Sequence, residues 1–219
     1  MELPTKRRIA LILSIAFIVF LTWTSVTFQQ ILSRYIPYFE KLALSNQILS
    51  AAIFIGLAIL STMFSSFSSV PLVPIAVLVW GNWLTALFLF LGWTTGDVLS
   101  YWIAYYAGNP IAKRLIPFEK IEFYRKKIPP DAEFKLVFFF IMSMPSEIPG
   151  YTLEILRYNF KRYLPITAFG EFIWAPVTAF AGLALIEKNL AFFAAAIGFM
   201  LLFFAYSFNL FQKYLQRKN

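Results

Sequence analysis

The sequence predicts an all-α integral membrane protein with four transmembrane helices and two opposed re-entrant helical hairpins arranged as an inverted repeat. Of its 219 residues, 60% are hydrophobic and only 14% are charged, whereas soluble domains carry about 25% charged residues. Several apolar runs are long enough to cross a hydrocarbon core about 30 Å thick. Two further runs are interrupted by pairs of prolines, and these interruptions predict the hairpins.

The chain is expected to form one membrane domain over residues 1–219, because no long polar segment separates its apolar runs. Its first helix follows Lys6, Arg7 and Arg8 and covers residues 9–28. This run is long enough to span and no A-x-A-like cleavage site follows it, so we interpret it as a retained helix and not as a signal peptide. The five expected parts are an N-terminal helix and connector (1–47), a first hairpin and span (48–108), a cytoplasmic loop (109–133), a second hairpin and span (134–186) and a C-terminal helix (187–219).

The first hairpin is predicted in the apolar run between residues 42 and 80. Pro71 and Pro74 interrupt this run, and the apolar residues left before Gly81 are too few to cross the core. Residues 83–107 then form a full span, which the sequence "GNP" at 108–110 is expected to end. The polar stretch 113–135 contains "FEKIEFYRKK", whose apolar residues at every third position favour a short helix on the membrane surface.

The second hairpin is predicted at "PSEIPGY", residues 145–151. Proline costs about 3 kcal/mol inside a helix, so Pro145 and Pro149 indicate a turn between two short apolar arms, 134–144 and 148–157. Each arm is long enough to cross only about half of the core. We therefore expect Lys135 and Arg157 on the same side of the membrane. Spans over 163–186, with a kink at Pro176, and over 190–211 complete the prediction.

The distribution of Lys and Arg favours hairpins over crossings. With two hairpins, one side of the membrane receives 16 basic residues and the other only Arg34, Lys41 and Lys188, as the positive-inside rule requires of a cytoplasmic face. If residues 42–67 crossed instead, the basic loop 113–135 would lie outside. Both termini are therefore expected in the cytoplasm. The 16 residues are Lys6, Arg7, Arg8, Lys113, Arg114, Lys120, Arg125, Lys126, Lys127, Lys135, Arg157, Lys161, Arg162, Lys213, Arg217 and Lys218.

The composition excludes several kinds of chemistry. The chain contains no Cys and no His, which removes thiolate and imidazole metal sites, Cys–His or Ser–His nucleophiles and disulfides. Its net charge of +8 is explained better by membrane orientation and anionic lipid than by nucleic acid, because the basic residues flank apolar runs. No metal or cofactor is expected.

The acidic residues within apolar runs are the candidates for function, because an acid in hydrocarbon costs at least about 2.5 kcal/mol unless it is compensated. Asp97 lies deep in the span 83–107, Glu147 lies at the tip of the second hairpin, and Glu171 lies in the span that follows. We predict transport or proton-coupling roles for these three. The alternative for Asp97 is a structural acid bonded to a neighbouring helix end. Candidates for the hairpin turns or for head-group contact are Pro71, Pro74, Pro145, Pro149, Glu154 and Arg157.

The remaining motifs have less specific interpretations. Glu154 and Arg157 are spaced to pair on a helix, and the alternative is an interfacial ion pair of little energetic value. Gly92 and Gly96 form a G-x-x-x-G face that predicts close helix packing. Gly108 and Gly170 are further packing candidates. Six aromatic residues are interpreted as interfacial belt and packing and not as a ligand cage: Trp80, Trp83, Trp93, Tyr101, Trp102 and Tyr105.

Four segments together resemble the DedA family, also described as the VTT-domain or SNARE-associated Golgi protein family. They are "GWTTGDVLSYWIAYYAG" (92–108), "PLVPIAVLVWG" (71–81), "MPSEIPGY" (144–151) and "FGEFIWAPVTAFAG" (169–182), within roughly residues 50–182. The resemblance implies two opposed re-entrant hairpins and movement of lipids between leaflets. In bacterial members the cargo is a polyprenyl-phosphate carrier, and in eukaryotic members the activity is phospholipid scrambling.

The chain departs from the family pattern at both hairpins. Ile75 and Ala76 follow Pro74 where many bacterial members carry a glutamate. Met142 and Ile148 flank the Pro145 turn where those members carry arginines.

We therefore expect a lipid translocase, a flippase or scramblase, that moves a phospholipid or a polyprenyl phosphate with or without proton coupling. It is expected in the plasma membrane of a prokaryote, as a monomer or homo-oligomer, without nucleic acid as a partner and without enzymatic activity. The alternative functions are a membrane-protein assembly or insertion factor and an intramembrane lipid-modifying enzyme. The enzyme is disfavoured because the Asp-rich magnesium-binding repeat of lipid phosphotransferases is not visible in the sequence.

Overall fold

The structure is a computed structural model that describes residues 41, 45–64, 68–115, 128, 132–144 and 147–217. This part of the chain contains six α-helices, one 3₁₀ helix and no strand, which confirms the predicted all-α class. The expected helix at 9–28 and the expected surface helix in the 113–135 stretch lie outside the described residues. The elements are α2 (Gln47–Met63), η1 (Val70–Leu72), α3 (Val73–Leu115), α5 (Phe134–Met142), α6 (Glu147–Ile155), α7 (Phe160–Ile186) and α8 (Leu190–Arg217).

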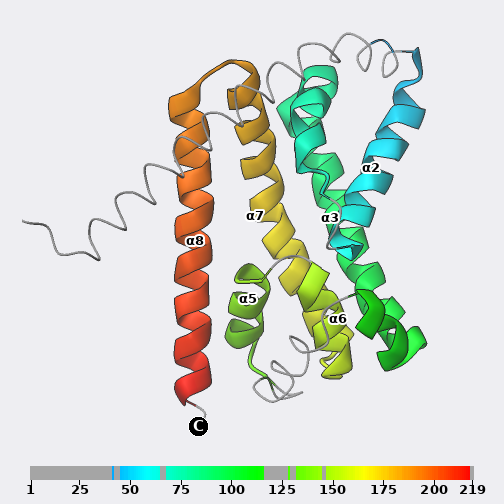
Figure 1. Ribbon diagram of the computed structural model, residues 1–219, viewed down its shortest axis with the longest axis vertical. Coiled ribbons are helices and arrows are strands. Elements are labelled where there is room, and N and C mark those ends of the chain that lie inside the picture. Colours follow the sequence, from blue (N-terminus) through cyan, green and yellow to red (C-terminus); the bar gives the residue numbers. More distant parts are fainter. Residues whose placement is uncertain are drawn as a thin grey trace, which may run out of the picture.

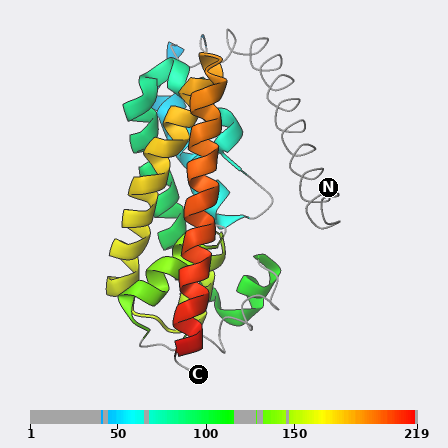
Figure 2. The same ribbon diagram turned by 90° about the vertical axis from the view of Figure 1, so that its left-hand side faces the viewer.

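Three helical stretches are long and apolar enough to cross a membrane: Val70–Tyr106, Phe160–Ile186 and Leu190–Gln216. The last two contain 27 residues each, or about 40 Å of helix, which exceeds the roughly 30 Å of a hydrocarbon core. Figure 2 shows α7 and α8 running side by side along the length of the molecule. These helices identify the chain as an integral membrane protein.

The chain reverses its direction at Gly81, inside α3. Gly81 has a φ of +75°, a left-handed conformation that glycine adopts without steric cost and that breaks an α-helical path. Ser69 and Trp93, which are equally distant from Gly81 in sequence, are joined by a hydrogen bond from Trp93 Nε1 to Ser69 Oγ at 3.1 Å. Ser69 also lies 3.0 Å from Ser61 Oγ of α2. The segment before Gly81 therefore lies antiparallel to the rest of α3. The start of this segment, at Ser69, contacts α2 near the end of that helix.

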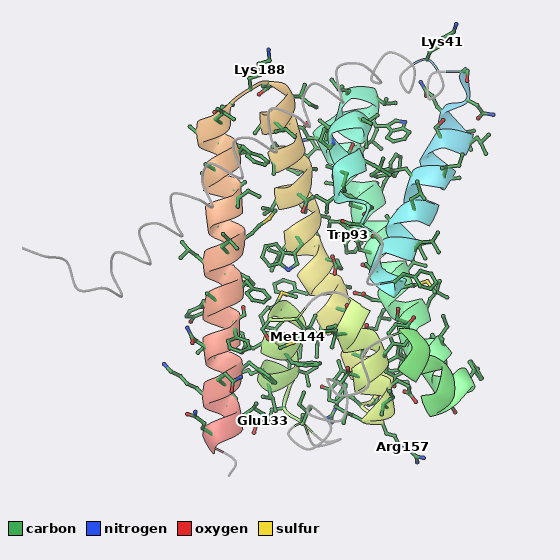
Figure 3. All side chains as sticks on the ribbon, in the orientation of Figure 1. Lys41, Trp93, Glu133, Met144, Arg157 and Lys188 are labelled. Carbon is green, nitrogen blue, oxygen red and sulfur yellow. The ribbon has the colours of Figure 1, made fainter. Side chains whose placement is uncertain are left out.

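The short helices α5 and α6 occupy the opposite end of the molecule from the Gly81 turn. Each has nine residues, or about 14 Å of helix. Figure 3 shows Glu133, just before α5, and Arg157, just after α6, at the same end, whereas Met144 lies between them in sequence and further into the molecule. Lys41 and Lys188 mark the other end. The molecule thus has an Arg157 end and a Lys188 end.

The predicted end of the first span is wrong. We expected helix to stop at Gly108–Pro110, but α3 continues to Leu115. Proline removes a backbone donor and clashes with the preceding turn, so it interrupts a straight helix, but it is also favoured in the first turn of a new one. In Figure 2 the last green turns of α3 run sideways from its main axis, which fits a helix that bends and restarts at Pro110.

Glycines allow the two halves of the chain to pack closely. A Cβ atom at Gly96 would overlap Thr62 of α2 and lie 2.5 Å from the Ile59 carbonyl oxygen, and one at Gly92 would lie 2.5 Å from Ala58 Cβ. The predicted G-x-x-x-G face therefore contacts α2. Gly170 of α7 lies similarly close to Met142 at the end of α5. In the first half of the chain (48–108), α3 thus contacts α2 through glycine, and in the second half (134–186), α7 contacts α5 in the same way.

A second set of glycine contacts joins the halves to each other. A Cβ at Gly150 of α6 would lie 3.0 Å from the Asp97 carbonyl oxygen of α3, and one at Gly182 of α7 would lie 2.9 Å from Val73 Cγ1 of α3. Figure 1 shows α3 and α7 adjacent in the middle of the molecule, with α6 beside both. The start of α3, before Gly81, therefore packs against α7 of the second half, and α6 packs against α3 of the first half.

The turns after α6 and α7 each contain a strained basic residue, which gives a first testable prediction. Arg157 and Lys188 have φ values of 55° and 57°, and this conformation costs an ordinary L-residue about 1–2 kcal/mol. Lys188→Gly is therefore expected to raise the apparent melting temperature in detergent. Lys213→Gly, within α8, should lower it, because glycine costs about 1 kcal/mol inside a helix. A lower melting temperature for Lys188→Gly would contradict the strain argument.

Candidate functional site

Asp97 is the centre of a polar cluster where α3, α6 and α7 meet. Its side chain is only 3% exposed. Thr167 of α7 donates a hydrogen bond from Oγ1 to Asp97 Oδ2 at 2.5 Å, whereas Oδ1 has no hydrogen-bond partner among the described residues. The Tyr163 hydroxyl, also on α7, donates to the Asp97 carbonyl oxygen at 3.2 Å. Two largely apolar helices are thus joined through buried polar groups.

Glu171 adds a second carboxyl group to this cluster. Tyr163, Thr167 and Glu171 are four residues apart and therefore share one face of α7. All three are buried, with Glu171 7% exposed. Glu171 and Asp97 are close enough to repel each other electrostatically when both are ionised. The cluster can therefore accept positive charge or donor groups.

The described basic side chains lie outside the middle parts of the long helices. They occur before or in the first turns of α2, α5 and α7, in the turns after α6 and α7, and near the end of α8: Lys41, Lys135, Arg157, Lys161, Arg162, Lys188 and Lys213. The structure gives no ion pair to Asp97 or Glu171 among the described side chains; the strongest bond to either is the neutral one from Thr167. Two acids without a described ion-pair partner within apolar helices are costly in a membrane, which keeps them as candidates for function.

The α6 helix forms the third wall of the cluster. Gly150 lies close to the Asp97 carbonyl, Ser100 and the Tyr163 hydroxyl. Tyr151 is fully buried, and its hydroxyl donates to the Met63 carbonyl oxygen of α2 at 3.3 Å. Proline at 149 is tolerated here because it lies in the first turn of α6. The polar cluster is therefore enclosed by elements from both halves of the chain.

The remaining predicted site residues are distributed as follows. Glu147 begins α6, but its side chain lies outside the described residues, as does Pro145. Pro71 lies in η1 and is exposed, and Pro74 is buried in the first turn of α3. Gly108 lies within α3. The structure therefore brings Asp97 and Glu171 together. The Pro71–Pro74 region instead contacts Gly182 of α7 through Val73 and Pro74.

Glu154 and Arg157 lie at the exposed end of α6. Partial burial raises the pKa of the Glu154 carboxyl, and both Tyr101 and the positive charge of Arg157 oppose that rise. The two side chains therefore attract each other, although the structure gives no direct salt bridge between these described residues. This fits the interpretation of a weak interfacial pair.

Sequence reasoning missed Ser100, Tyr151, Tyr163 and Thr167. Tyr163 and Thr167 precede Glu171 at helical spacing in an otherwise apolar segment, so a search for polar residues at every fourth position would have found them. Tyr151 lacked such a signal, because its contact with Met63 joins residues 88 apart in the sequence. Among the described residues no group of three or more acidic side chains could hold a metal ion.

Comparison with known proteins identifies the chain's family. A family model, the VTT domain, matches residues 67–184, which is more than half of the chain and includes α3, α5, α6 and most of α7. No curated protein and no solved structure matches this chain. The match includes Asp97, Glu147 and Glu171 and confirms the resemblance inferred from the sequence motifs. The chain belongs to the VTT-domain family, also described as the DedA or SNARE-associated Golgi protein family.

Proposed function

We propose that this protein moves phospholipids between the leaflets of a membrane, with Asp97 and Glu171 lining the polar path. The buried pair of carboxyl groups carries this proposal, together with the Asp97 Oδ1 atom, which no described donor reaches. A packing role would leave no reason to keep two acids at this depth, because apolar side chains of similar size pack without the cost of burying charge. Membership in the VTT-domain family supports a role that involves membrane lipid.

The re-entrant interpretation of the two short segments follows from their lengths and ends. The α5 and α6 helices, at about 14 Å each, are too short to cross a core of about 30 Å, and Glu133 and Arg157 lie at the same end (Figure 3). The segment before Gly81 likewise returns toward the Lys188 end. Within the membrane, non-helical backbone is tolerated only where it is buried in protein or lines a water-filled cavity. Two opposed broken segments at corresponding positions favour a transport site between them.

The charge distribution supports an orientation with the Arg157 end in the cytoplasm. Arg157 lies at that end, and Lys41 and Lys188 lie at the other (Figure 3). Lys135, Lys161, Arg162 and Lys213 lie in the first turns of α5 and α7 and near the end of α8, which Figure 1 shows toward the same end as the C-terminus of α8. The positive-inside rule places the more basic end in the cytoplasm. The C-terminus then lies in the cytoplasm, since α8 ends beside α5 and α6 (Figure 1).

The acidic character of the cluster favours a head group that carries a positive charge. Asp97 and Glu171 would attract an ammonium group and repel a phosphate that carries no compensating cation. The proposed cargo is therefore a zwitterionic phospholipid such as phosphatidylethanolamine, and not a polyprenyl phosphate. Its acyl chains would stay in the hydrocarbon while the head group passes the cluster.

The experiment is lipid exchange in liposomes that contain the purified full-length protein. Acyl-labelled phosphatidylethanolamine, phosphatidylglycerol and a polyprenyl phosphate are compared by the fraction of label that an impermeant quencher can reach. We expect protein-dependent exchange that is several-fold faster for phosphatidylethanolamine than for the two anionic lipids. Fastest exchange of the polyprenyl phosphate would contradict the cargo assignment, and no exchange of any lipid would contradict the translocase.

A further inference from the structure

The Asp97 cluster is closed by α6 in this structure. Gly150 lies so close to α3 and α7 that a Cβ atom there would be 3.0 Å from the Asp97 carbonyl oxygen, 3.0 Å from Ser100 Cβ and 3.2 Å from the Tyr163 hydroxyl. Asp97 is 3% exposed and Ser100 is fully buried. A head group that approaches the cluster from the side of α6 can therefore enter only if the first turns of α6 move away from α3.

Two tyrosine hydrogen bonds hold α6 in this position. At the outer end, the Tyr101 hydroxyl donates to the Tyr158 carbonyl oxygen at 2.5 Å, just beyond the left-handed Arg157. At the inner end, the Tyr151 hydroxyl donates to the Met63 carbonyl oxygen at 3.3 Å. The outer bond joins the turn that follows α6 to the long helix α3, whereas the inner bond joins α6 itself to the end of α2. The inner bond is the longer of the two.

The acceptor of the inner bond explains why this contact matters. Met63 is the last residue of α2, and the last four carbonyl groups of a helix have no partner within it. An unpaired carbonyl group is costly in a membrane, where no water is available to bond it. The Phe64 amide bonds to the Leu60 carbonyl, and among the described residues the Met63 carbonyl accepts its hydrogen bond from Tyr151. The end of α2 in one half of the chain thus depends on a side chain from the other half.

We propose that Tyr151 is the gate residue of the Asp97 cluster. Its hydroxyl joins α2 to α6 and holds α6 closed over Asp97. Opening breaks the Tyr151–Met63 bond, and α6 moves about the turn that follows it, where Tyr101 still holds Tyr158. The transport consequence rests on the proposed lipid translocation, but the gate itself is a property of the fold. Tyr151 contacts no cargo in this role and acts by positioning α6.

The gate is tested by the reactivity of a single cysteine, which is clean because the chain contains none. Ser100→Cys places a thiol under α6, and Ser207→Cys places a matched thiol on α8, since both serines are fully buried. We expect Tyr151→Phe to raise the rate of maleimide labelling several-fold at position 100 and to leave position 207 unchanged. An unchanged rate at position 100 overturns the gate. Equal increases at both positions also overturn it, because Tyr151 would then only stabilise the whole fold.

A double-cysteine variant tests whether locking the gate in its closed position stops lipid exchange. Met63→Cys with Tyr151→Cys, treated with a short bis-maleimide, ties α2 to α6, and a monofunctional maleimide is the control. We expect lipid exchange to stop only with the bifunctional reagent, whereas Tyr151→Phe alone should accelerate exchange several-fold. Unimpeded exchange after complete cross-linking overturns the gate. Absence of exchange in the parent protein contradicts the proposed function but leaves the labelling test at position 100 valid.

Discussion

Gly96→Ala is expected to destabilise the protein by about 1–2 kcal/mol, even though alanine is the better helix former. The new Cβ atom would overlap Thr62 and lie 2.5 Å from the Ile59 carbonyl oxygen of α2. Because that oxygen belongs to the backbone, α2 as a whole must move away from α3. Overpacking of this kind costs about 1–3 kcal/mol, which outweighs the gain in helix propensity of up to about 1 kcal/mol.

Gly56→Ala is the matched control, since Gly56 lies on α2 with no atom within 4 Å of an added Cβ. Both changes add one methyl group to a helical glycine, so the difference between them isolates the contact between α2 and α3. The measurement is the apparent melting temperature in detergent, which should fall for Gly96→Ala and stay level or rise for Gly56→Ala. A fall of the same size for both variants would show that the close contact at Gly96 does not hold the helices together.

The sequence predicted those features of the fold that depend on local rules. Long apolar runs predicted α7 and α8, because any helix that crosses a membrane must be about 20 apolar residues long. Pro145 and Pro149 predicted the break between α5 and α6, and the spacing of Gly92 and Gly96 predicted a close helix contact. The end of α3 was mispredicted because Pro110 both interrupts one helix and suits the start of another.

The candidate site was less accessible to sequence reasoning, because its geometry comes from contacts between distant segments. An acid in an apolar run is conspicuous, so Asp97 and Glu171 were found. Their proximity was not predictable, since it depends on how α3 crosses α7. Thr167 is neutral and common in membrane helices, and only its hydrogen bond to Asp97 distinguishes it. The Tyr151 contact with Met63 joins the two halves of the chain and has no local signature.

Asp97→Asn is expected to abolish lipid exchange, with a fall of at least about tenfold, which corresponds to about 1.4 kcal/mol in the barrier. The amide oxygen can still accept the hydrogen bond from Thr167, so the contact between α3 and α7 persists. The side chain can no longer ionise and cannot attract an ammonium head group. Expression and melting temperature should match or exceed those of the parent, because a buried acid is removed. Equal exchange rates for mutant and parent would assign Asp97 to structure.

Glu171→Gln, alone and combined with Asp97→Asn, tests whether the two carboxyl groups act together on one head group or independently. Because Asp97 and Glu171 lie close enough to repel each other, we expect them to act on the same cationic group. The double variant should therefore lose little more activity than either single variant, since residues that act as a unit are not additive. Glu133→Gln makes the same chemical change at an exposed position before α5 and should leave exchange unchanged. If the losses from Asp97→Asn and Glu171→Gln instead multiply in the double variant, the two carboxyl groups act at separate steps of the path, and the single polar cluster between α3 and α7 is not where the head group passes.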